Sequence, residues 1–237
     1  MPLNSLGQPI GDPVSGWRPP HSPARVVLKG RYCVLEPLDA ARHTRDLWAA
    51  YATADDLRHW TYLINGPFTS LGEYESWVSR AVLTTDPLFY AVLQAGRAVG
   101  VAAYLRIAPE AGSIEVGHIN FSPLLQRTPA ATEAMFLMMR QAFELGYRRY
   151  EWKCDSFNAP SRAAAQRLGL SYEGIFRQAL VYKDRNRDTA WYATIDQEWP
   201  ALRAAFERWL DPGNFDDEGR QRVSLSSLTA PILVSRG

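Results

Sequence analysis

The chain has 237 residues, of which 46% are hydrophobic and 22% are charged, and its 26 Lys and Arg face 25 Asp and Glu. This length suits one domain of ordinary size or two small ones, and the composition is that of a soluble globular protein. The formal net charge is only +1, whereas proteins that bind nucleic acids or membrane surfaces usually carry a clear excess of positive charge. We therefore expect no nucleic acid and no membrane as partners, and favour small-molecule or protein substrates.

The two cysteines and the lengths of the apolar runs further limit the class of protein to which the chain can belong. Cys33 and Cys154 stand alone and far apart, which gives neither a disulfide framework nor metal-ligand spacing, so we expect two buried thiols and no metal. No apolar run is long enough to span a bilayer, and the first residues lack the pattern of a signal peptide. A cytoplasmic location is the default expectation.

Composition divides the chain into three parts. Residues 1–24 hold six prolines and three glycines and predict an extended N-terminal arm, which Trp17 should dock onto the rest. Residues 25–210 carry the periodic patterns of a folded domain. Residues 211–237 begin with Asp-Pro-Gly and an acidic patch and predict a C-terminal extension.

The periodic region predicts four helices and seven strands. In chain order they are a strand at 31–37, helices at 38–51 and 70–83, strands at 88–93, 98–107 and 113–121, a helix at 128–145, a strand at 149–155, a helix at 158–168, and strands at 175–182 and 189–195. Gly96 favours a hairpin turn after 93, and Thr128 followed by Pro129 is typical of a helix start. A polar turn at 183–188 joins the last two strands. Early strands with one β-α-β crossover indicate an α+β domain around a mixed sheet.

Three segments in this order resemble motifs of the GNAT acetyltransferase superfamily. They are Gln126-Arg127-Thr128-Pro129-Ala130-Ala131, then Asn158-x-x-Ser161 continuing to Arg167-Leu168-Gly169, and the ending from Asp188-Thr189 to Glu198-Trp199. The ending is similar to the branch that acetylates the N-termini of ribosomal proteins. The resemblance implies a GNAT fold, with a mostly antiparallel mixed sheet of about seven strands splayed at its centre and about four flanking helices. It also implies acetyl-CoA as co-substrate and a primary amine as acceptor, and leaves a homodimer open.

The first motif has a physical basis for binding a phosphate. A helix N-terminus offers unpaired N–H groups and a partial positive charge. The resemblance assigns cofactor binding to a run of residues around this terminus: Gln126, Arg127, Thr128, Ala130 and Ala131. Pro129 stands where the family normally has Gly, so one N–H donor is missing.

The second motif implies residues for the thioester arm. Strands 113–121 and 149–155 should splay to admit it, with Asn158 bonded to the arm and Ser161 near the sulfur; Arg162 could face phosphates. Asn158 is equally suited to cap its own helix. Many family members carry a Tyr at the position of Ala165 to protonate the leaving thiolate, so Ser161 or a water must serve here, with Tyr172 a weaker candidate. Because a thiol has a pKa near 8.5, the thiolate of CoA is already a fair leaving group, and the reaction can proceed without this Tyr.

Strand 113–121 carries the candidates for the base that accepts the amine proton. Glu115 matches an acid that the family often places there, although a salt-bridged carboxylate would look the same. Alternation puts Glu115 and Gly117 on one face and His118 on the other, and a structural role is favoured for His118.

In the family the acceptor lies beside the two early helices. Trp60, Tyr62 and Phe68 are therefore candidates for its wall, and core packing explains these aromatic residues equally well. Two further functions stay open. One is acetyl transfer to a small molecule such as an antibiotic or an aminoacyl conjugate, and the other is a non-catalytic binding module, which Pro129 and Ala165 favour slightly.

Overall fold

The central meander forms as its pattern predicts in the computed structural model, which describes residues 1–237. Strand β3 (Leu88–Gln94) turns into β4 (Arg97–Ala108) through Ala95 and Gly96, which both have positive φ angles, 49° and 79°. Two residues of positive φ give a turn whose twist matches that of the strands it joins. Strand β5 (Ser113–Phe121) then pairs antiparallel with β4.

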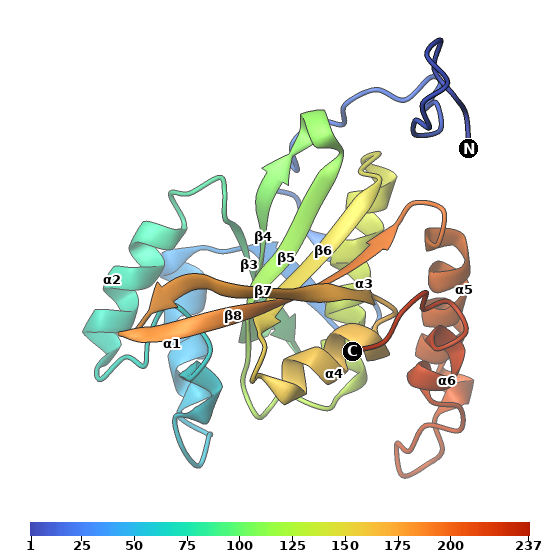
Figure 1. Ribbon diagram of the computed structural model, residues 1–237. Helices are drawn as coiled ribbons and strands as arrows, with labels where there is room; N and C mark the ends of the chain where they lie inside the picture. The colour runs from blue at the N-terminus through green and yellow to red at the C-terminus, as the bar shows by residue number, and fades with distance from the viewer.

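One eight-stranded sheet runs through the molecule in the order β1-β2-β3-β4-β5-β6-β8-β7 (Figure 1). The remaining strands are β1 (Leu28–Lys29), β2 (Val34–Pro37), β6 (Arg149–Asp155), β7 (Ser171–Tyr182) and β8 (Arg185–Ile195). All neighbours are antiparallel except β5 and β6. Their parallel pairing covers only Ser113–Val116 against Arg149–Trp152, and the strands then separate, as the sequence predicted.

Six α-helices flank the sheet. They are α1 (Ala40–Tyr51), α2 (Leu71–Ala81), α3 (Pro129–Glu144), α4 (Ala159–Arg167), α5 (Trp199–Leu210) and α6 (Leu225–Thr229). The first four begin at side-chain caps, in which Asp39, Ser70, Thr128 and Asn158 each accept a hydrogen bond from the N–H three residues further on. Such caps satisfy N–H groups that the helix itself leaves unpaired.

The sheet separates two apolar clusters. Helices α1 and α2 cover one face, where Leu47 and Tyr74 pack on β3 and β4. Helices α3 and α5 cover the other face, and Phe136 and Phe206 stack there with centroids 5.2 Å apart. Cys33 and Cys154 are both buried free thiols, as expected. The two faces of the sheet are thus closed independently, and a site between β5 and β6 opens only where those strands part.

The predicted fold class is confirmed, and three details of the structure differ from the elements that the sequence predicts. The sheet has an eighth, two-residue strand, β1, which pairs with β2 and was not predicted. Helices α5 and α6 raise the helix count above four. The turn between β7 and β8 is only Lys183–Asp184, with φ angles of 49° and 57°, so β8 begins at Arg185 instead of residue 189. The polar side chains after Asp184 belong to the start of β8, where Arg185 and Asn186 are exposed and Arg187 and Asp188 are half-buried.

The two ends of the chain differ. The first residues of the chain project from the body in Figure 1, and Trp17 contacts the body under the guanidinium of Arg148, 5.8 Å from its ring. The C-terminal residues fold back instead, and Val234 N–H donates to Ser171 Oγ at the start of β7. None of the helices is long and apolar enough to cross a bilayer.

Candidate active site

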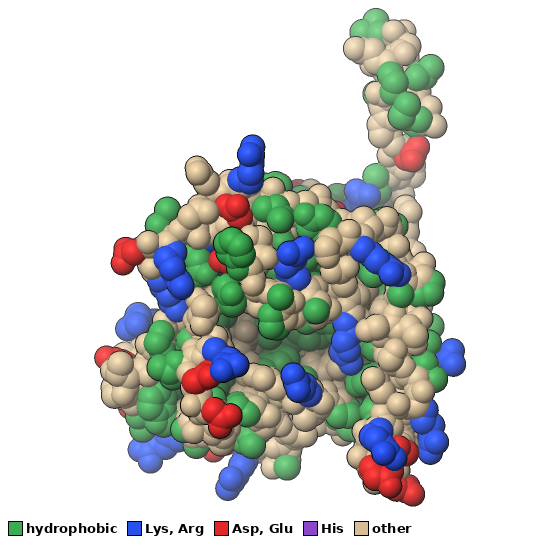
Figure 2. Space-filling view, turned by 60° about the horizontal axis from the view of Figure 1, so that its bottom comes forward, with side chains coloured by type: hydrophobic (Ala, Val, Ile, Leu, Met, Phe, Trp, Pro, Cys, Tyr) green, Lys and Arg blue, Asp and Glu red, His purple; other side chains and the backbone are tan.

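Two cavities meet where β5 and β6 separate. We name them cavity A, of about 710 Å³, beside β4, β5, β6 and the loop at residues 58–64, and cavity B, of about 1100 Å³, beside α3, α4 and residues 209–221. The residues that line both are Arg58, His59, Ile119, Gln126, Trp152, Asn158, Pro160 and Ser161. Figure 2 shows a hollow with Lys and Arg side chains at its rim on the face that lies at the bottom of Figure 1. The shared lining makes A and B two ends of one passage through the splayed sheet.

The N-terminus of α3 borders cavity B. Gln126, Arg127, Thr128 and Ala131 line it, whereas Ala130 is buried in the core and does not. Thr128 Oγ1 accepts the N–H of Ala131 at 3.2 Å, and Gln126 Nε2 donates to the Phe121 carbonyl at 2.6 Å. These contacts satisfy part of the hydrogen-bonding capacity of this helix terminus within the chain. The partial positive charge of the terminus remains available to an anion.

Helix α4 starts at the junction of the two cavities. Asn158 Oδ1 accepts the N–H of Ser161 at 3.2 Å, so the capping interpretation of Asn158 is confirmed. Arg162 lines neither cavity. Its Nε donates to the Tyr192 hydroxyl at 3.1 Å and its Nη1 to the Ser156 carbonyl at 3.2 Å, which directs the guanidinium away from the passage.

Ser161 is oriented by β6. The indole Nε1 of Trp152 donates to Ser161 Oγ at 3.0 Å. Because an indole N–H can only donate, the hydroxyl hydrogen of Ser161 is directed elsewhere. Cys154 also borders cavity A, and burial raises the pKa of its thiol, which keeps this sulfur protonated and a poor nucleophile.

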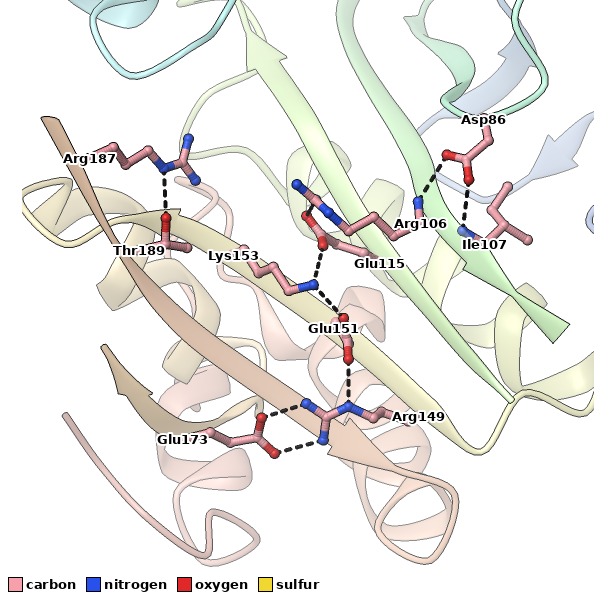
Figure 3. A network of polar contacts seen from close by, with 10 residues as sticks. All are labelled: Asp86, Arg106, Ile107, Glu115, Arg149, Glu151, Lys153, Glu173, Arg187 and Thr189. Atoms are coloured by element: carbon pink, nitrogen blue, oxygen red, sulfur yellow. Dashed lines mark hydrogen bonds and ion pairs between the residues drawn. The ribbon is translucent and has the colours of Figure 1, made fainter. Parts of the chain in front are cut away.

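Glu115 reaches cavity A from β5 and is almost fully buried. Its Oε1 accepts a hydrogen bond from Arg106 Nη1 at 2.7 Å, and its Oε2 lies 2.9 Å from Lys153 Nζ (Figure 3). Burial raises the pKa of Glu115, while Lys153 and Arg106 act against that rise. The carboxylate is therefore salt-bridged and also faces the cavity, so the salt-bridge interpretation is confirmed and the role of Glu115 as a base stays a prediction.

The ion pairs continue across the sheet from Glu115. Lys153 Nζ lies 2.8 Å from Glu151, Glu151 pairs with Arg149 at 2.6 Å, and Arg149 binds both oxygens of Glu173 (Figure 3). The Lys153 ammonium also sits 3.7 Å from the centroid of the Trp191 ring. Charges alternate along this row, so the buried ammonium is matched on both sides.

A bulge in β5 overturns the predicted placement of His118. His118 has a φ of 48°, and the register against β4 shifts between Val101 and Ala103. The extra residue reverses the alternation, so His118 packs on Phe89, with ring centroids 5.1 Å apart, on the same face of the sheet as Glu115. Burial lowers the pKa of His118, and Arg106 lowers it further.

The three aromatic candidates for the acceptor wall lie in different surroundings. Trp60 and Phe68 pack edge to face with centroids 5.3 Å apart and belong to the cluster under α1 and α2. Tyr62 lines cavity A, and its hydroxyl donates to the Phe157 carbonyl at 3.2 Å. The β7–β8 hairpin closes over this loop, because Lys183 Nζ donates to the Trp60 carbonyl at 2.8 Å and Arg185 Nη2 to that of Thr61 at 3.2 Å.

Sequence reasoning missed several lining residues. His59 stacks on Tyr51 beside both cavities, and Arg167 donates to Thr132 Oγ1 at 3.1 Å within cavity B. Arg187 and Asp155 border cavity A. Arg167 stands in the quoted Arg-Leu-Gly segment, which could have identified it. Asp155 and Arg187 depend on pairings between distant strands, and His59 depends on how its loop packs on α1.

A parallel strand pair that opens between two cavities, one of them at two helix N-termini, is an arrangement with room for two bound groups. The chain belongs to the GNAT acetyltransferase family, whose domain model matches residues 33–171, and it is an acyltransferase. A GCN5-related N-acetyltransferase from Brucella melitensis is 46% identical, with a TM-score of 0.89 over 92% of this chain and 100% of that one.

Two more distant matches are a protein related in sequence and a solved structure. An uncharacterized N-acetyltransferase of Bacillus subtilis, YnaD, is 28% identical over 86 residues, which make up 36% of this chain and 50% of that protein. A Salmonella typhimurium enzyme that modifies the N-terminal serine of ribosomal protein L7/L12 is 20% identical, with a TM-score of 0.63 over 72% of this chain and 99% of that one. The fold is thus GNAT, and acetyl-CoA is the acetyl donor that this family uses in general.

Proposed function

We propose that the chain transfers the acetyl group of acetyl-CoA to a primary amine by direct attack of the amine on the thioester. The observation that carries the proposal is the passage formed by cavities A and B. Cavity B, at the starts of α3 and α4, suits the phosphates and the pantetheine arm. Cavity A, lined by Glu115 and closed over by the β7–β8 hairpin, suits the amine.

Two lining residues have catalytic roles in this proposal. Glu115 accepts the amine proton, directly or through a water, and Ser161 delivers a proton to the departing thiolate. The burial of Cys154 supports direct transfer, because a thiol with a raised pKa is unsuited to carry the acetyl group as an enzyme intermediate. We also propose residues 25–210 as the catalytic domain, with 1–24 as an arm and 211–237 as an extension.

The acceptor is an N-terminus of a protein or a small amine. The contacts of Lys183 and Arg185 with the loop at 60–61 favour a slim acceptor, either a small molecule or a chain end that enters tip first. A folded surface loop would meet this hairpin before it reached Glu115.

The test is a calorimetric titration with acetyl-CoA together with thermal unfolding in the presence of acetyl-CoA or CoA. We expect both ligands to raise the melting temperature, and acetyl-CoA to raise it more, because ligands that bind only the folded state stabilise it. Release of free thiol with a panel of amines then establishes transfer. No shift with either ligand at millimolar concentration would favour the non-catalytic binding module.

A further inference from the structure

Cavity A carries an excess of positive charge. Its cationic lining residues are Arg58, Arg106, Lys153 and Arg187, and its anionic ones are Glu115 and Asp155. The whole chain has a net charge of only +1. Cavity A therefore combines both signs of charge, whereas cavity B is lined by Arg58, Arg127, Arg167 and Arg220 and by no carboxylate.

Most of these charges have a partner in the chain. Arg106 and Lys153 share Glu115, and Arg58 pairs with Asp56 at the surface. Asp155 forms no ion pair, but its oxygens accept hydrogen bonds from the Tyr182 hydroxyl at 2.8 Å and from the Phe157 N–H at 2.9 Å.

Arg187 differs, because no carboxylate lies within ion-pair distance of it. Its Nε donates to Thr189 Oγ1 at 3.1 Å, and its Cζ lies 5.8 Å from the centroid of the Tyr182 ring. Its two terminal Nη groups have no hydrogen-bond or ion-pair partner in the chain (Figure 3). The side chain is half-buried and borders cavity A. A guanidinium presents its Nη groups as a fork that matches a carboxylate.

The phosphates of the cofactor do not account for this group. Arg106, Lys153 and Arg187 line cavity A alone, whereas the cations that border only cavity B are Arg127, Arg167 and Arg220. The molecule therefore separates one set of cations at the cofactor helices from another around the acceptor.

We propose that the acceptor carries a carboxylate close to its amine, and that Arg187 binds this carboxylate while the amine points toward Glu115. This inference rests on the proposed function of the same site. The carboxylate can belong to a free amino acid or to an acidic side chain next to the N-terminus of a peptide. Arg187 is then a specificity residue that selects acidic over neutral amines.

Two matched pairs of acceptors test the inference and distinguish the sources. The first pair is methionine and methionine amide, and the second is the C-terminally amidated peptides Ser-Asp-Ala-Ala and Ser-Asn-Ala-Ala. We expect the acidic member of at least one pair to show a kcat/KM about ten-fold or more above its neutral partner, mainly through KM, as a charged hydrogen bond provides. A preference for the acidic member of the first pair would identify the acceptor as a free amino acid. A preference for the acidic member of the second pair would identify it as the N-terminus of a peptide.

The Arg187→Met variant keeps the apolar stem of the side chain and should abolish this preference, because kcat/KM for the acidic amines should fall to the level of their neutral partners. Arg187→Lys should keep part of it, and Arg177→Met, at an exposed position of β7 outside cavity A, should keep all of it. Melting temperatures of the variants report their folding.

Equal kcat/KM values for acidic and neutral members in both pairs would overturn the carboxylate site and leave acetyl transfer intact. So would a preference that survives in Arg187→Met. A chain that fails to bind acetyl-CoA would instead contradict the proposed function, which separates the two failures.

Discussion

Lys153 Nζ lies 2.9 Å from Glu115 Oε2 and joins β6 to β5 at the level where the hydrogen-bonded register of these two strands ends. Both side chains are nearly buried, with exposed fractions of 7% and 3%. The desolvation of two ions is costly unless they pair closely, so this ion pair offsets part of the rise that burial causes in the pKa of Glu115. The same contact limits how freely Glu115 can accept a proton.

Replacing Glu115 with Gln tests its role as the base. We expect turnover to fall by roughly 10²-fold or more with nearly unchanged affinity for acetyl-CoA, because Gln keeps the shape and removes the basicity. Lys153 retains Glu151 as a partner 2.8 Å away, so the fold should persist. Steady-state kinetics and calorimetric titration of acetyl-CoA measure the two effects.

Glu151→Gln is the matched control, since it removes the other carboxylate that faces Lys153 but does not border cavity A. It should change turnover far less than Glu115→Gln. If His118→Ala abolished turnover and Glu115→Gln did not, the base would be His118.

The sequence predicted what depends on local chemistry. Thr128 and Asn158 indicate helix starts because a capping side chain accepts a hydrogen bond from the N–H only three residues further along the chain. The side of the sheet on which His118 lies could not be predicted, because a bulge is set by the register between β4 and β5. The pairing of Lys153 with Glu115 likewise requires two strands separated by α3, and alternation within one strand contains no information about it. The acceptor-wall residues were ambiguous for the same reason, since Trp60 and Tyr62 differ only in what packs around them.

Two histidines should make the stability of the protein fall toward acidic pH. Burial lowers the pKa of His118 and of His59 below the ordinary value of 6.5. Between the lowered value and about 6.5 the unfolded chain binds protons that the folded chain does not, so the free energy of unfolding decreases as pH falls through this window and is fully present above it.

Denaturant unfolding at pH 7.5 and 5.5 measures this effect. Between pH 7.5 and 5.5 the double variant His59→Gln with His118→Gln should lose less free energy of unfolding than the unmodified chain loses. The control variant His21→Gln, changed at an exposed residue near the N-terminus, should lose as much as the unmodified chain. The comparison cancels Glu115, whose raised pKa acts in the opposite sense, because its contribution is present at low pH and lost as pH rises. An unchanged difference in the double variant would contradict the assignment.

Pro129→Gly should separate affinity from stability. Pro129 occupies the first turn of α3 beside cavity B and has no N–H, so Gly restores a donor near the expected pyrophosphate. A hydrogen bond to a charged group is worth ~1.5–3 kcal/mol, which is an upper bound where water competes. Loss of Pro costs ~0.4–1 kcal/mol of stability through the unfolded chain. We expect the affinity for acetyl-CoA to rise or stay the same while the melting temperature falls. Several-fold weaker binding by a folded variant would mean that Pro129 shapes the loop.

The hydroxyl of Ser161 should matter less than the carboxylate of Glu115, and its importance should depend on pH. Trp152 Nε1 donates to Ser161 Oγ at 3.0 Å, so the hydroxyl hydrogen is available for the departing sulfur. Because a free thiol has a pKa near 8.5, the thiolate needs little protonation above that pH. Ser161→Ala should therefore lower kcat by about ten-fold near pH 7, and the loss should shrink as the pH approaches 9.

Two variants distinguish proton delivery by Ser161 from a purely structural role. Ser161→Thr keeps the hydroxyl and should retain most of the activity, whereas Trp152→Phe removes the N–H that orients Ser161 and should reproduce the pH-dependent loss in part. Rates of thiol release from pH 6.5 to 9 give the profile for each variant. A loss in Ser161→Ala that stays constant across this range would show that Ser161 does not protonate the thiolate, because removal of a proton donor must matter less once the leaving group is stable as an anion.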